Sequence, residues 1–435
     1  MNIIQGFMLL NTKKRRLNNS SAISTFTMNI LFVTRLYSGF EESLYKKVWK
    51  PEGVPTIYKL FNKLSLSHKL SIIFTAKDSG ATYTSNWEET RDVDVKLKNL
   101  KADIKVLCGT KYFFSFIPRK LAMIMRDARQ FIKIIFYVRT KKPDLIYCDS
   151  ANVVIAFLLT KLFPNKPIVV RVLGVCSFWR SIINSRRIVH RVYKFSFKGK
   201  FSAVIGTQDG SGIEYWFEET LIKGVPRYVL LNGVDNGQNT NKLNKKFKTI
   251  LFVGRLEEYK GILIFLNAII KILKEKKHKL NIVVIGDGTL YDQAINLCKD
   301  SGFFDKFQFL KSIPHQDVLK YHLKSDIYVS ANTDGNLINT NLEAISSNAC
   351  MVIPKPQREK FIDIETSNLL GNAVLYYEVN DVNDLKNKIL YLLNSPSKIK
   401  DFKNKISSAK LKFMRTWDQR INEEKNILEN IVTNN

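Results

Sequence analysis

The second half of the chain contains a loop whose charged residues could bind a diphosphate. It is GRLEEYKG, from Gly254 to Gly261, where an apolar run ends and a helical stretch begins. Arg255 offers a guanidinium fork for two phosphate oxygens, and Lys260 adds a compact cation. The helix that begins at Gly261 presents free N–H groups to an anion. Such a set would stabilise the charge that develops on a diphosphate leaving group. A basic loop exposed to water is the alternative.

A second loop, between Ser330 and Pro354, carries two carboxylates in the run SANTDGNLINTNLEAISSNACMVIP. Asp334 stands on the loop, and Glu343 is expected in the first turn of the helix that follows. Carboxylate oxygens at such positions accept hydrogen bonds from sugar hydroxyls, and Gly335 lets the backbone approach a ligand closely. The alternative is that Glu343 only complements the positive end of the helix dipole.

Both loops follow short β-branched or aromatic runs, and such runs alternate with amphipathic stretches of helical length along the chain. This alternation predicts an α/β fold with parallel sheets, in which ligands bind at the carboxyl ends of the strands. The predicted strands are 29–34, 70–75, 103–107, 145–148, 168–172, 203–207, 249–253, 281–285, 306–310, 327–330 and 351–353. The predicted helices are 56–64, 151–162, 262–275, 290–301, 318–322 and 342–347, with a mostly helical tail from residue 382.

A turn-rich segment, NGVDNGQNTNKLNKK, follows Leu231 and is typical of a linker. It divides the 435 residues into an N-terminal domain, 28–235, and a C-terminal domain, 236–405, followed by a helical tail, 406–435. Residues 1–27 are predicted to be a disordered or wrongly assigned extension, because Met28 opens a strand-like run. A basic arm that targets a membrane is the alternative for this extension.

Charge is the feature of the composition that bears most on function. The formal net charge is +29, and residues 101–200 hold 21 basic and 4 acidic residues. Such a field attracts nucleic acid, anionic lipid or phosphorylated substrates; a generally lysine-rich proteome is the alternative. The five cysteines are scattered without a CxxC pair, which favours a reducing, cytoplasmic compartment. No apolar run reaches the length of about 20 residues that spans a bilayer.

Taken in order, these motifs resemble those of the retaining glycosyltransferases of family 4. That family has the GT-B fold, in which two Rossmann-like domains face each other across a cleft. The resembling string runs from Leu231 to Pro354 and comprises an NGV linker, GRLEEYKG, a strand ending in GDG, FQFLKSIP and a loop with two acids before EA. In the first half NILFVT, GVPT, PDLIYCDS and KPIVVRVLG resemble the family more weakly. Trp417 resembles a residue of the family's crossing helix.

The resemblance implies a role for each matching position. Arg255 and Lys260 would hold the donor diphosphate, Glu343 would bind the ribose, and Asp334 would contact the transferred sugar. Backbone near Ile313 would border the nucleobase. The implied donor-binding set is Gly254, Arg255, Lys260, Gly286, Ile313, Gly335, Asn336, Thr340, Asn341, Leu342 and Glu343, and the implied catalytic set is Arg255, Lys260, Asp334 and Glu343. The implied positions on the acceptor side are Gly39, Gly53, Arg171 and Gly174.

Two departures from the family pattern bear on the transferred sugar. The family places its two acids eight positions apart, whereas Asp334 and Glu343 are nine apart, so the role of Asp334 stays open. The family's histidine before a glycine is replaced here by Leu173 before Gly174. The nearby Arg171 is the candidate substitute for that histidine.

No metal and no other cofactor is expected. Asp92-Val93-Asp94 matches the DxD signature by which other glycosyltransferases bind a metal, but its run, RDVDVKL, has the alternating charge of a solvated strand. The cations Arg255 and Lys260 would do the charge work that a metal does elsewhere. The histidines have no metal-ligand spacing and are expected at the surface; they are His68, His190, His278, His315 and His322.

Residues 111–142, KYFFSFIPRKLAMIMRDARQFIKIIFYVRTKK, mix aromatic and basic side chains and predict a helix after Pro118. Basic amphipathic helices lie on anionic membranes, so one interpretation is peripheral docking on the inner face of the plasma membrane. The other is an ordinary helix packed on the sheet with a solvated basic face. No known nucleic-acid-binding module is present, so nucleic acid is not expected as a partner.

The sequence therefore predicts a retaining, hexosyl-type glycosyltransferase that moves a sugar from a nucleotide diphosphate to a hydroxyl acceptor. The expected acceptor is a lipid-linked or growing glycan, as in the synthesis of bacterial cell-surface polysaccharide or lipopolysaccharide. Two other interpretations stay open. One is an epimerase or phosphorylase with the GT-B fold, and the other is a basic binding protein with that fold that has lost its activity.

Overall fold

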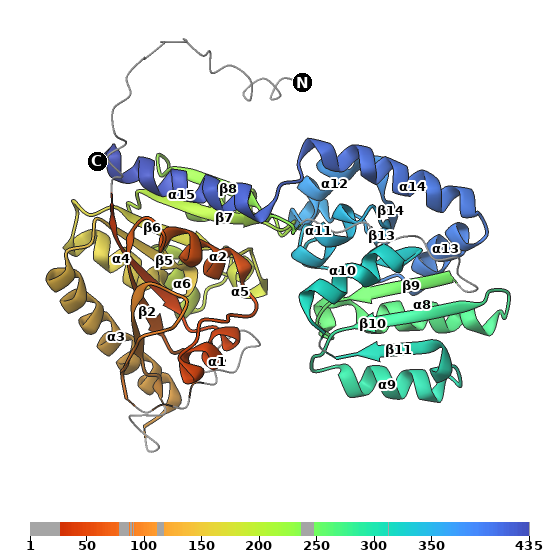
Figure 1. Cartoon of the computed structure of the whole chain (residues 1–435), viewed down its shortest axis with the longest axis horizontal. Coiled ribbons are helices and arrows are strands. Elements are labelled where there is room, and N and C mark those ends of the chain that lie inside the picture. Colours follow the sequence, from red (N-terminus) through yellow and green to blue (C-terminus); the bar gives the residue numbers. More distant parts are fainter. Residues whose placement is uncertain are drawn as a thin grey trace, which may run out of the picture.

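The computed structural model describes residues 27–77, 87, 89, 91–110, 117–235, 248–311 and 313–434. Within these ranges the chain forms two α/β domains, each built on one sheet (Figure 1). The predicted extension, apart from Thr27, lies outside the described residues, and so does most of the predicted linker after Asp235.

The N-terminal domain has an eight-stranded sheet in the order β3-β4-β2-β1-β5-β6-β7-β8. Strand β3 is antiparallel to β4, and the other described pairs are parallel. The strands are β1 Asn29–Arg35, β2 Lys69–Thr75, β3 Val93–Val95, β4 Ala102–Leu107, β5 Leu145–Asp149, β6 Ile168–Val172, β7 Ala203–Gln208 and β8 Arg227–Leu231. The strand order reverses between β1 and β5, which makes that gap the topological switch point of the sheet.

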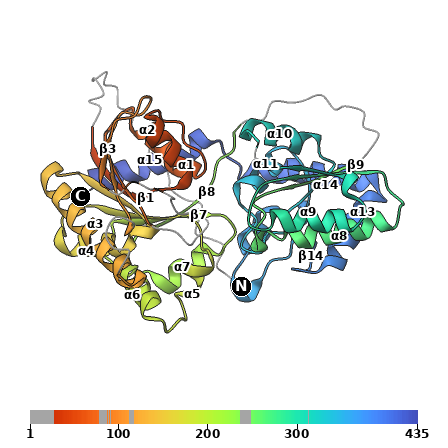
Figure 2. The same cartoon turned by 90° about the horizontal axis from the view of Figure 1, so that it is seen from below.

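Helices cover both faces of this sheet (Figure 2). On one face lie α1 Ser38–Lys46, α2 Pro55–Leu64 and the C-terminal α15 Trp417–Thr433. On the other lie α3 Arg119–Lys141, α4 Val153–Leu162, α5 Ser177–Ser181, α6 Ile188–Ser196 and α7 Ile213–Thr220. Right-handed crossovers explain the division, because connections that step in opposite directions along the sheet place their helices on opposite faces.

The C-terminal domain has a six-stranded parallel sheet in the order β11-β10-β9-β12-β13-β14, with its switch point between β9 and β12. The strands are β9 Lys248–Val253, β10 Leu280–Ile285, β11 Phe307–Leu310, β12 Ile327–Val329, β13 Cys350–Pro354 and β14 Leu375–Tyr377. The helices are α8 Ile262–Lys274, α9 Tyr291–Asp300, α10 His315–Lys324, α11 Asn339–Ser346, α12 Ile364–Leu370, α13 Val382–Leu393 and α14 Pro396–Ala409.

The last helix, α15, returns from the C-terminal domain to the N-terminal one, as the resemblance of Trp417 implies. A capping box between Thr416 and Gln419 begins the helix, and Trp417, Ile421 and Leu428 are buried in the N-terminal core. The preceding α14 still packs on the C-terminal domain, where its Ile406 is buried. The C-terminal domain therefore extends to the end of α14, slightly beyond the predicted boundary at residue 405.

A buried ionic network holds α15 to the sheet. Glu424 of α15 is fully buried; it lies 3.6 Å from Arg171 on β6 and 2.7 Å from Arg420, and it accepts a hydrogen bond from Tyr147 on β5. Burial alone would raise the pKa of Glu424, but the guanidinium groups of Arg420 and Arg171 hold this pKa below its ordinary value. The expectation that Arg171 lines the acceptor side is wrong, because its side chain is fully buried in this network.

Two further expectations concern individual residues. The predicted solvated strand contains β3, Val93–Val95. Asp92, just before β3, pairs with Arg129 at 2.8 Å, and Asp94 within it pairs with Lys105 at 2.8 Å. The expectation that every histidine lies at the surface is wrong for three of them. These are His68, His190 and His322, whose rings are buried. Among the described residues, no helix has both the length and the apolar character to cross a membrane.

We expect Glu424→Gln to lower the free energy of unfolding by about 3–5 kcal/mol, because it leaves two buried guanidinium groups without a counter-charge. The matched control is Glu423→Gln on the same helix, where a half-exposed side chain pairs with Arg415 and the expected loss is at most about 1 kcal/mol. Urea unfolding followed by tryptophan fluorescence measures both. Equal losses in the two variants would show that the network does not stabilise α15.

Candidate active site

The two charged loops of the C-terminal half meet at the switch point of its sheet. Thr333, on the loop after β12, donates its backbone N–H to the Tyr259 carbonyl at 2.9 Å. Gly261 has φ +69°, and a Cβ at this position would lie 2.4 Å from the Ala331 carbonyl oxygen. A residue without a side chain is therefore needed for the loops after β9 and β12 to lie this close.

The loop after β10 joins this arrangement through a second glycine contact. A Cβ at Gly286 would lie 1.9 Å from the Gly254 carbonyl oxygen, and the Gly254 N–H donates to the Ile285 carbonyl at 3.0 Å. Ile313 follows the neighbouring strand β11 and is half-buried. The loops predicted to bind the donor thus follow strands β11, β10, β9 and β12, which are neighbours in the sheet.

Arg255 and Lys260 both lie close to the ring of Tyr259. The Arg255 guanidinium is 5.9 Å and the Lys260 ammonium 5.1 Å from the ring centre of Tyr259, and Arg255 also donates to the Tyr259 hydroxyl. Burial and the nearby Arg255 charge lower the pKa of Lys260 to about 8, and burial lowers the pKa of Arg255. Two partly desolvated like charges would be relieved by a bound dianion such as a diphosphate.

Glu343 lies in α11, which follows the loop after β12. The helix begins at Asn339, three residues earlier than predicted, so Glu343 stands in the second turn instead of the first. Because the helix dipole acts mainly within the first turn, this placement disfavours the alternative in which Glu343 serves only the dipole. Thr340, in the first turn, is half-buried.

Several residues predicted to bind the donor instead shape the loop. Asn336 is fully buried; its side-chain amide donates to Asp363 at 2.6 Å, and its side-chain oxygen accepts from Ser330 at 2.8 Å. Asn341 is also fully buried and donates to the Asn336 carbonyl at 3.1 Å. Leu342 lies in the core. In this arrangement the three side chains fix the backbone of the loop and are closed to a ligand.

Asp334, the acid with the irregular spacing, forms an ion pair with the other domain. Its carboxylate lies 3.3 Å from the guanidinium of Arg180 on α5. Arg180 also donates to the carbonyls of Val175 and Ser211, at 3.2 Å each. Sequence spacing gave no signal for this pair, because its two members lie on different domains.

Backbone contacts join the domains beside this pair. We call them the interdomain contact: the Leu337 N–H donates to the Asp209 carbonyl at 3.0 Å, and the Asp363 N–H donates to the Gly210 carbonyl at 2.7 Å. Gly335 lies so close that a Cβ there would be 2.6 Å from the Asp209 carbonyl oxygen. The loop after β7 therefore packs directly on the loops after β12 and β13.

Asp209 is a site residue that sequence reasoning missed. Burial raises the pKa of its carboxyl group to about 6, against the hydrogen bonds that Ser211 donates to it. Lys260 of the other domain is within electrostatic reach of this carboxylate. A Cβ at Gly174 would lie 2.0 Å from Asp209 Oδ2, so Gly174 of the predicted acceptor side faces Asp209. The sequence did offer a signal, since the glycine-rich run DGSG directly follows a predicted strand.

The switch point of the N-terminal sheet lies on the side predicted for the acceptor. Asp149, at the end of β5, accepts hydrogen bonds from the Thr34 hydroxyl at 3.0 Å and the Arg35 N–H at 2.9 Å. The thiol of Cys176 is within electrostatic reach of Arg35 in its own domain and of Tyr259 in the C-terminal domain. The carboxyl edges of the two sheets therefore face each other.

The two remaining glycines of the predicted acceptor side lie in the segments after β1. Gly39 is in the first turn of α1, and a Cβ there would lie 2.0 Å from the Glu52 carbonyl oxygen. Gly53 has φ +64° and has no atom within 4 Å of the place a Cβ would occupy. Gly39 is therefore a packing glycine, whereas Gly53 allows a turn in the backbone before α2.

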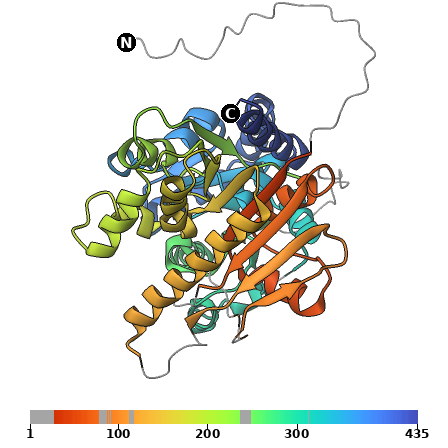
Figure 3. The ribbon, with the colours of Figure 1, turned by 90° about the vertical axis from the view of Figure 1, so that its left-hand side faces the viewer.

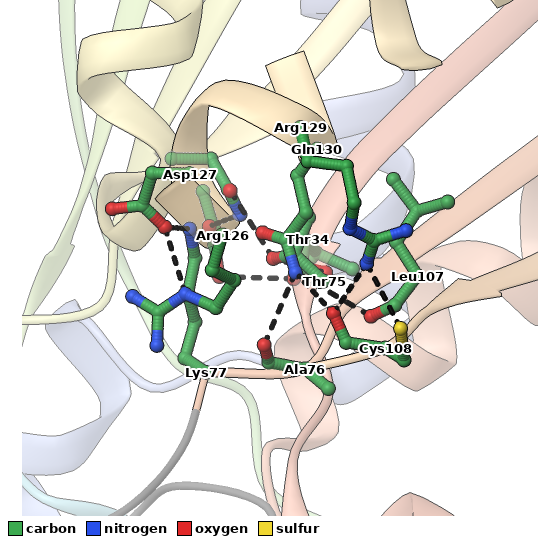
Figure 4. Close-up of polar contacts among 12 residues, drawn as sticks. Thr34, Thr75, Ala76, Lys77, Leu107, Cys108, Arg126, Asp127, Arg129 and Gln130 are labelled. Atoms are coloured by element: carbon green, nitrogen blue, oxygen red, sulfur yellow. Dashed lines mark hydrogen bonds and ion pairs between the residues drawn. The ribbon is translucent and has the colours of Figure 1, made fainter. Parts of the chain in front are cut away.

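A cluster of polar side chains lies at the carboxyl ends of β2 and β4 in the N-terminal sheet (Figure 4). The Gln130 amide of α3 donates to the carbonyls of Ala76 at 3.2 Å and Cys108 at 3.0 Å. Lys77 donates to Asp127 at 2.9 Å. The inward side of α3 thus binds the strand ends. Among the described residues no three His, Cys, Asp or Glu side chains are grouped so that they could hold a metal ion.

Comparison with known proteins agrees with this geometry. Residues 235–409 match the family described as glycosyl transferases group 1. The C-terminal domain belongs to that family. A search of curated proteins matches an uncharacterised glycosyltransferase of Methanocaldococcus jannaschii, 31% identical over 106 residues that cover 24% of this chain. The match spans about a quarter (27%) of the length of that relative.

The fold of the whole chain is that of the GT-B glycosyltransferases. The sucrose-phosphate synthase of Thermosynechococcus elongatus superposes with a TM-score of 0.69 over 94% of this chain and 100% of that one, at 13% identity. The Anabaena protein HepE in complex with UDP gives a TM-score of 0.63 over 93% and 100%, at 13% identity. The lipopolysaccharide outer core galactosyltransferase WaaB gives 0.58 over 93% and 99%, at 14% identity.

The tight packing at the interdomain contact predicts that adding a single methyl group at Gly210 disturbs it. We expect Gly210→Ala to separate the two loops, because its Cβ would lie 2.5 Å from Asp363 Oδ1 and 2.7 Å from the Asn336 nitrogen. The amides of Leu337 and Asp363 should then exchange faster with solvent, as measured by hydrogen–deuterium exchange. Gly224→Ala is the matched control, since Gly224 has a similar φ, +88° against +85°, and open space around it. Unchanged exchange in Gly210→Ala would contradict a tight contact.

Proposed function

We propose that this glycosyltransferase moves a hexose from a nucleoside diphosphate to a hydroxyl group of an acceptor, with retention of the anomeric configuration. The observation that carries the proposal is the pair of partly desolvated cations, Arg255 and Lys260, at the switch point of the C-terminal sheet. They are the groups that a diphosphate leaving group requires. The UDP bound by HepE, a protein of the same fold, supports a nucleoside diphosphate as the donor.

Each group has a defined part in the proposed reaction. Arg255 and Lys260 bind the diphosphate, Glu343 accepts hydrogen bonds from the ribose, and backbone near Ile313 borders the base. The bond between the anomeric carbon and the phosphate oxygen breaks as the acceptor oxygen bonds to the same face of that carbon. The acceptor's proton passes to the leaving phosphate, so the products are a glycoside and a nucleoside diphosphate. No protein nucleophile and no metal are needed, because the two cations stabilise the charge.

The acceptor side is the carboxyl edge of the N-terminal sheet. We propose a lipid-linked or growing cell-surface glycan as the acceptor and the cytoplasmic face of the membrane as the place of reaction. The strong positive charge of residues 101–200 supports this choice, since it favours an anionic surface or acceptor.

A screen of donors tests the function. We expect one or more of the UDP- and GDP-sugars to raise the melting temperature of the protein, because a ligand that binds only the folded state stabilises it. The double variant Arg255→Ala/Lys260→Ala should lose this shift. Lys299→Ala is the control, because Lys299 also lies over an aromatic ring, Phe304 at 5.7 Å, but on α9.

The same screen separates the alternatives. A sugar nucleotide consumed without any acceptor would indicate an epimerase or phosphorylase. A protein that binds none of the sugar nucleotides, in the wild type as in the double variant, would indicate a basic binding protein. The pair between Asp334 and Arg180 and the substitution of Leu173 for histidine are the features that favour this last interpretation.

The lowered pKa of Lys260 predicts how donor binding depends on pH. Below about pH 8 its ammonium is charged in the free protein, whereas above this value it must take up a proton to hold the diphosphate. The affinity for UDP, measured by calorimetry, should therefore fall above pH 8, by at most about tenfold per pH unit. In Lys260→Arg the guanidinium stays charged, so the affinity should be nearly constant up to about pH 9.5. Parallel curves for the two proteins would rule out Lys260 as the titrating group.

A further inference from the structure

Helix α3 buries polar as well as apolar side chains against the protein. Its buried stripe repeats every four residues and includes Arg126 and Gln130, which bind Asp127 and the strand ends (Figure 4). The members of this stripe are Ala122, Arg126, Gln130, Ile134 and Val138. A surface helix normally buries its apolar side chains and exposes its polar ones, so this inward face is unusual.

The outward side of α3 carries a strip of exposed apolar side chains. Ile132 is 65% exposed and Phe136 is 68% exposed. The exposed apolar side chains of this helix are Leu121, Met123, Ile124, Met125, Ile132 and Phe136. At 3.6 residues per turn, Leu121, Met125, Ile132 and Phe136 share the side opposite the buried stripe. In Figure 3 this helix lies in the foreground of the N-terminal domain.

Helix α6 repeats the pattern. Ile188 is 79% exposed and Phe195 is 61% exposed, and with Val192 they stand at positions i, i+4 and i+7. These three side chains therefore form one stripe along the helix. Val189 beside them is exposed as well.

The two helices belong to the same layer of the N-terminal domain (Figure 2). Between them lies α4, whose Phe157 contacts Phe195 of α6 with ring centres 5.1 Å apart. We call the outward side chains Leu121, Ile124, Met125, Ile132, Phe136, Ile188, Val189, Val192 and Phe195 the α3–α6 surface. Isolated exposed apolar residues are ordinary, but apolar residues gathered over one layer mark an interaction site.

Charge identifies the kind of partner. Helices α3, α4, α5 and α6 hold eleven Lys or Arg and one acidic residue, Asp127. That carboxylate is engaged by Lys77 and Arg126 at 2.9 Å each. Among the cations of these helices, Arg126, Arg129 and Arg180 are bound within the protein. The exposed cations include Lys120, Lys133, Arg139, Lys161 and Arg191. An apolar strip rimmed by cations matches an anionic bilayer, in which the apolar side chains enter the interface and the cations meet lipid phosphates. A second copy of this chain, at net charge +29, would bring like charges together.

We infer that the α3–α6 surface binds the protein peripherally to an anionic phospholipid bilayer. The inference rests on the proposed function for its purpose, which is to bring a lipid-linked acceptor to the site. Helix α5 connects the surface to the site. Phe178 of α5 contacts His190 and Tyr193 of α6, with ring centres 5.1 and 5.4 Å apart, and Arg180 of the same helix pairs with Asp334 of the C-terminal domain.

Vesicle sedimentation tests the surface with the full-length protein. Wild type is expected to pellet with vesicles of phosphatidylglycerol and phosphatidylcholine, to remain in the supernatant with pure phosphatidylcholine, and to dissociate as salt is raised. The variants Ile132→Glu/Phe136→Glu and Val192→Glu/Phe195→Glu should each reduce the fraction bound at least about tenfold, because they remove apolar contacts and add negative charge. Leu66→Glu is the matched control; it is 83% exposed and lies beyond α2, on the other face of the sheet, so its binding should equal that of wild type.

Each outcome decides the inference. Binding that is equal in the surface variants and in wild type, or absent in wild type, overturns it. So does a stable dimer, seen by analytical ultracentrifugation without lipid, that the same variants dissociate. The melting-temperature shift with UDP, measured on every variant, should match that of wild type and shows that the variants are folded. If UDP does not raise the melting temperature of wild type, the proposed donor site is refuted, whereas the result of the vesicle experiment still stands.

Discussion

The relative position of the two sheets depends on backbone packing against backbone at the interdomain contact. The carbonyls of Asp209 and Gly210 accept hydrogen bonds from two amides of the other domain, and the loops come this close because there is no room for a Cβ at Gly210 or Gly335. The contact places Lys260 near Asp209 and Asp334 near Arg180. The charges that surround the proposed diphosphate site therefore come from both domains, although the residues proposed to bind the diphosphate belong to one.

Much of the fold could be predicted from the sequence because of how parallel sheets are buried. Strands such as Leu145–Asp149 and Leu280–Ile285 are almost entirely buried, so each reads as an apolar run with a single polar residue. Strands β8 and β14 escaped prediction because they are short and partly exposed, with patterns that no simple period describes. The resemblance of the motif string to a known family implied that two Rossmann-like domains face each other. The structural neighbours confirm this fold.

The candidate site could be predicted only where neighbouring residues in the sequence form it. Arg255, Tyr259 and Lys260 lie within one loop, and their grouping is local. Asn336 and Asn341 could not be assigned from spacing, because their burial depends on Asp363, a residue of a later loop. Arg171 was misplaced for a similar reason, since the partner that buries it, Glu424, lies on the last helix of the chain.

The return of α15 also has a consequence for how the protein is made. The core of the N-terminal domain includes Trp417, Ile421 and Leu428, and Arg171 in its sheet receives its counter-charge from Glu424. A ribosome synthesises these residues only after the entire C-terminal domain. The N-terminal domain is thus translated before the C-terminal one but completed after it, and a nascent chain that stops short of α15 leaves a buried arginine and an apolar face of its sheet uncovered.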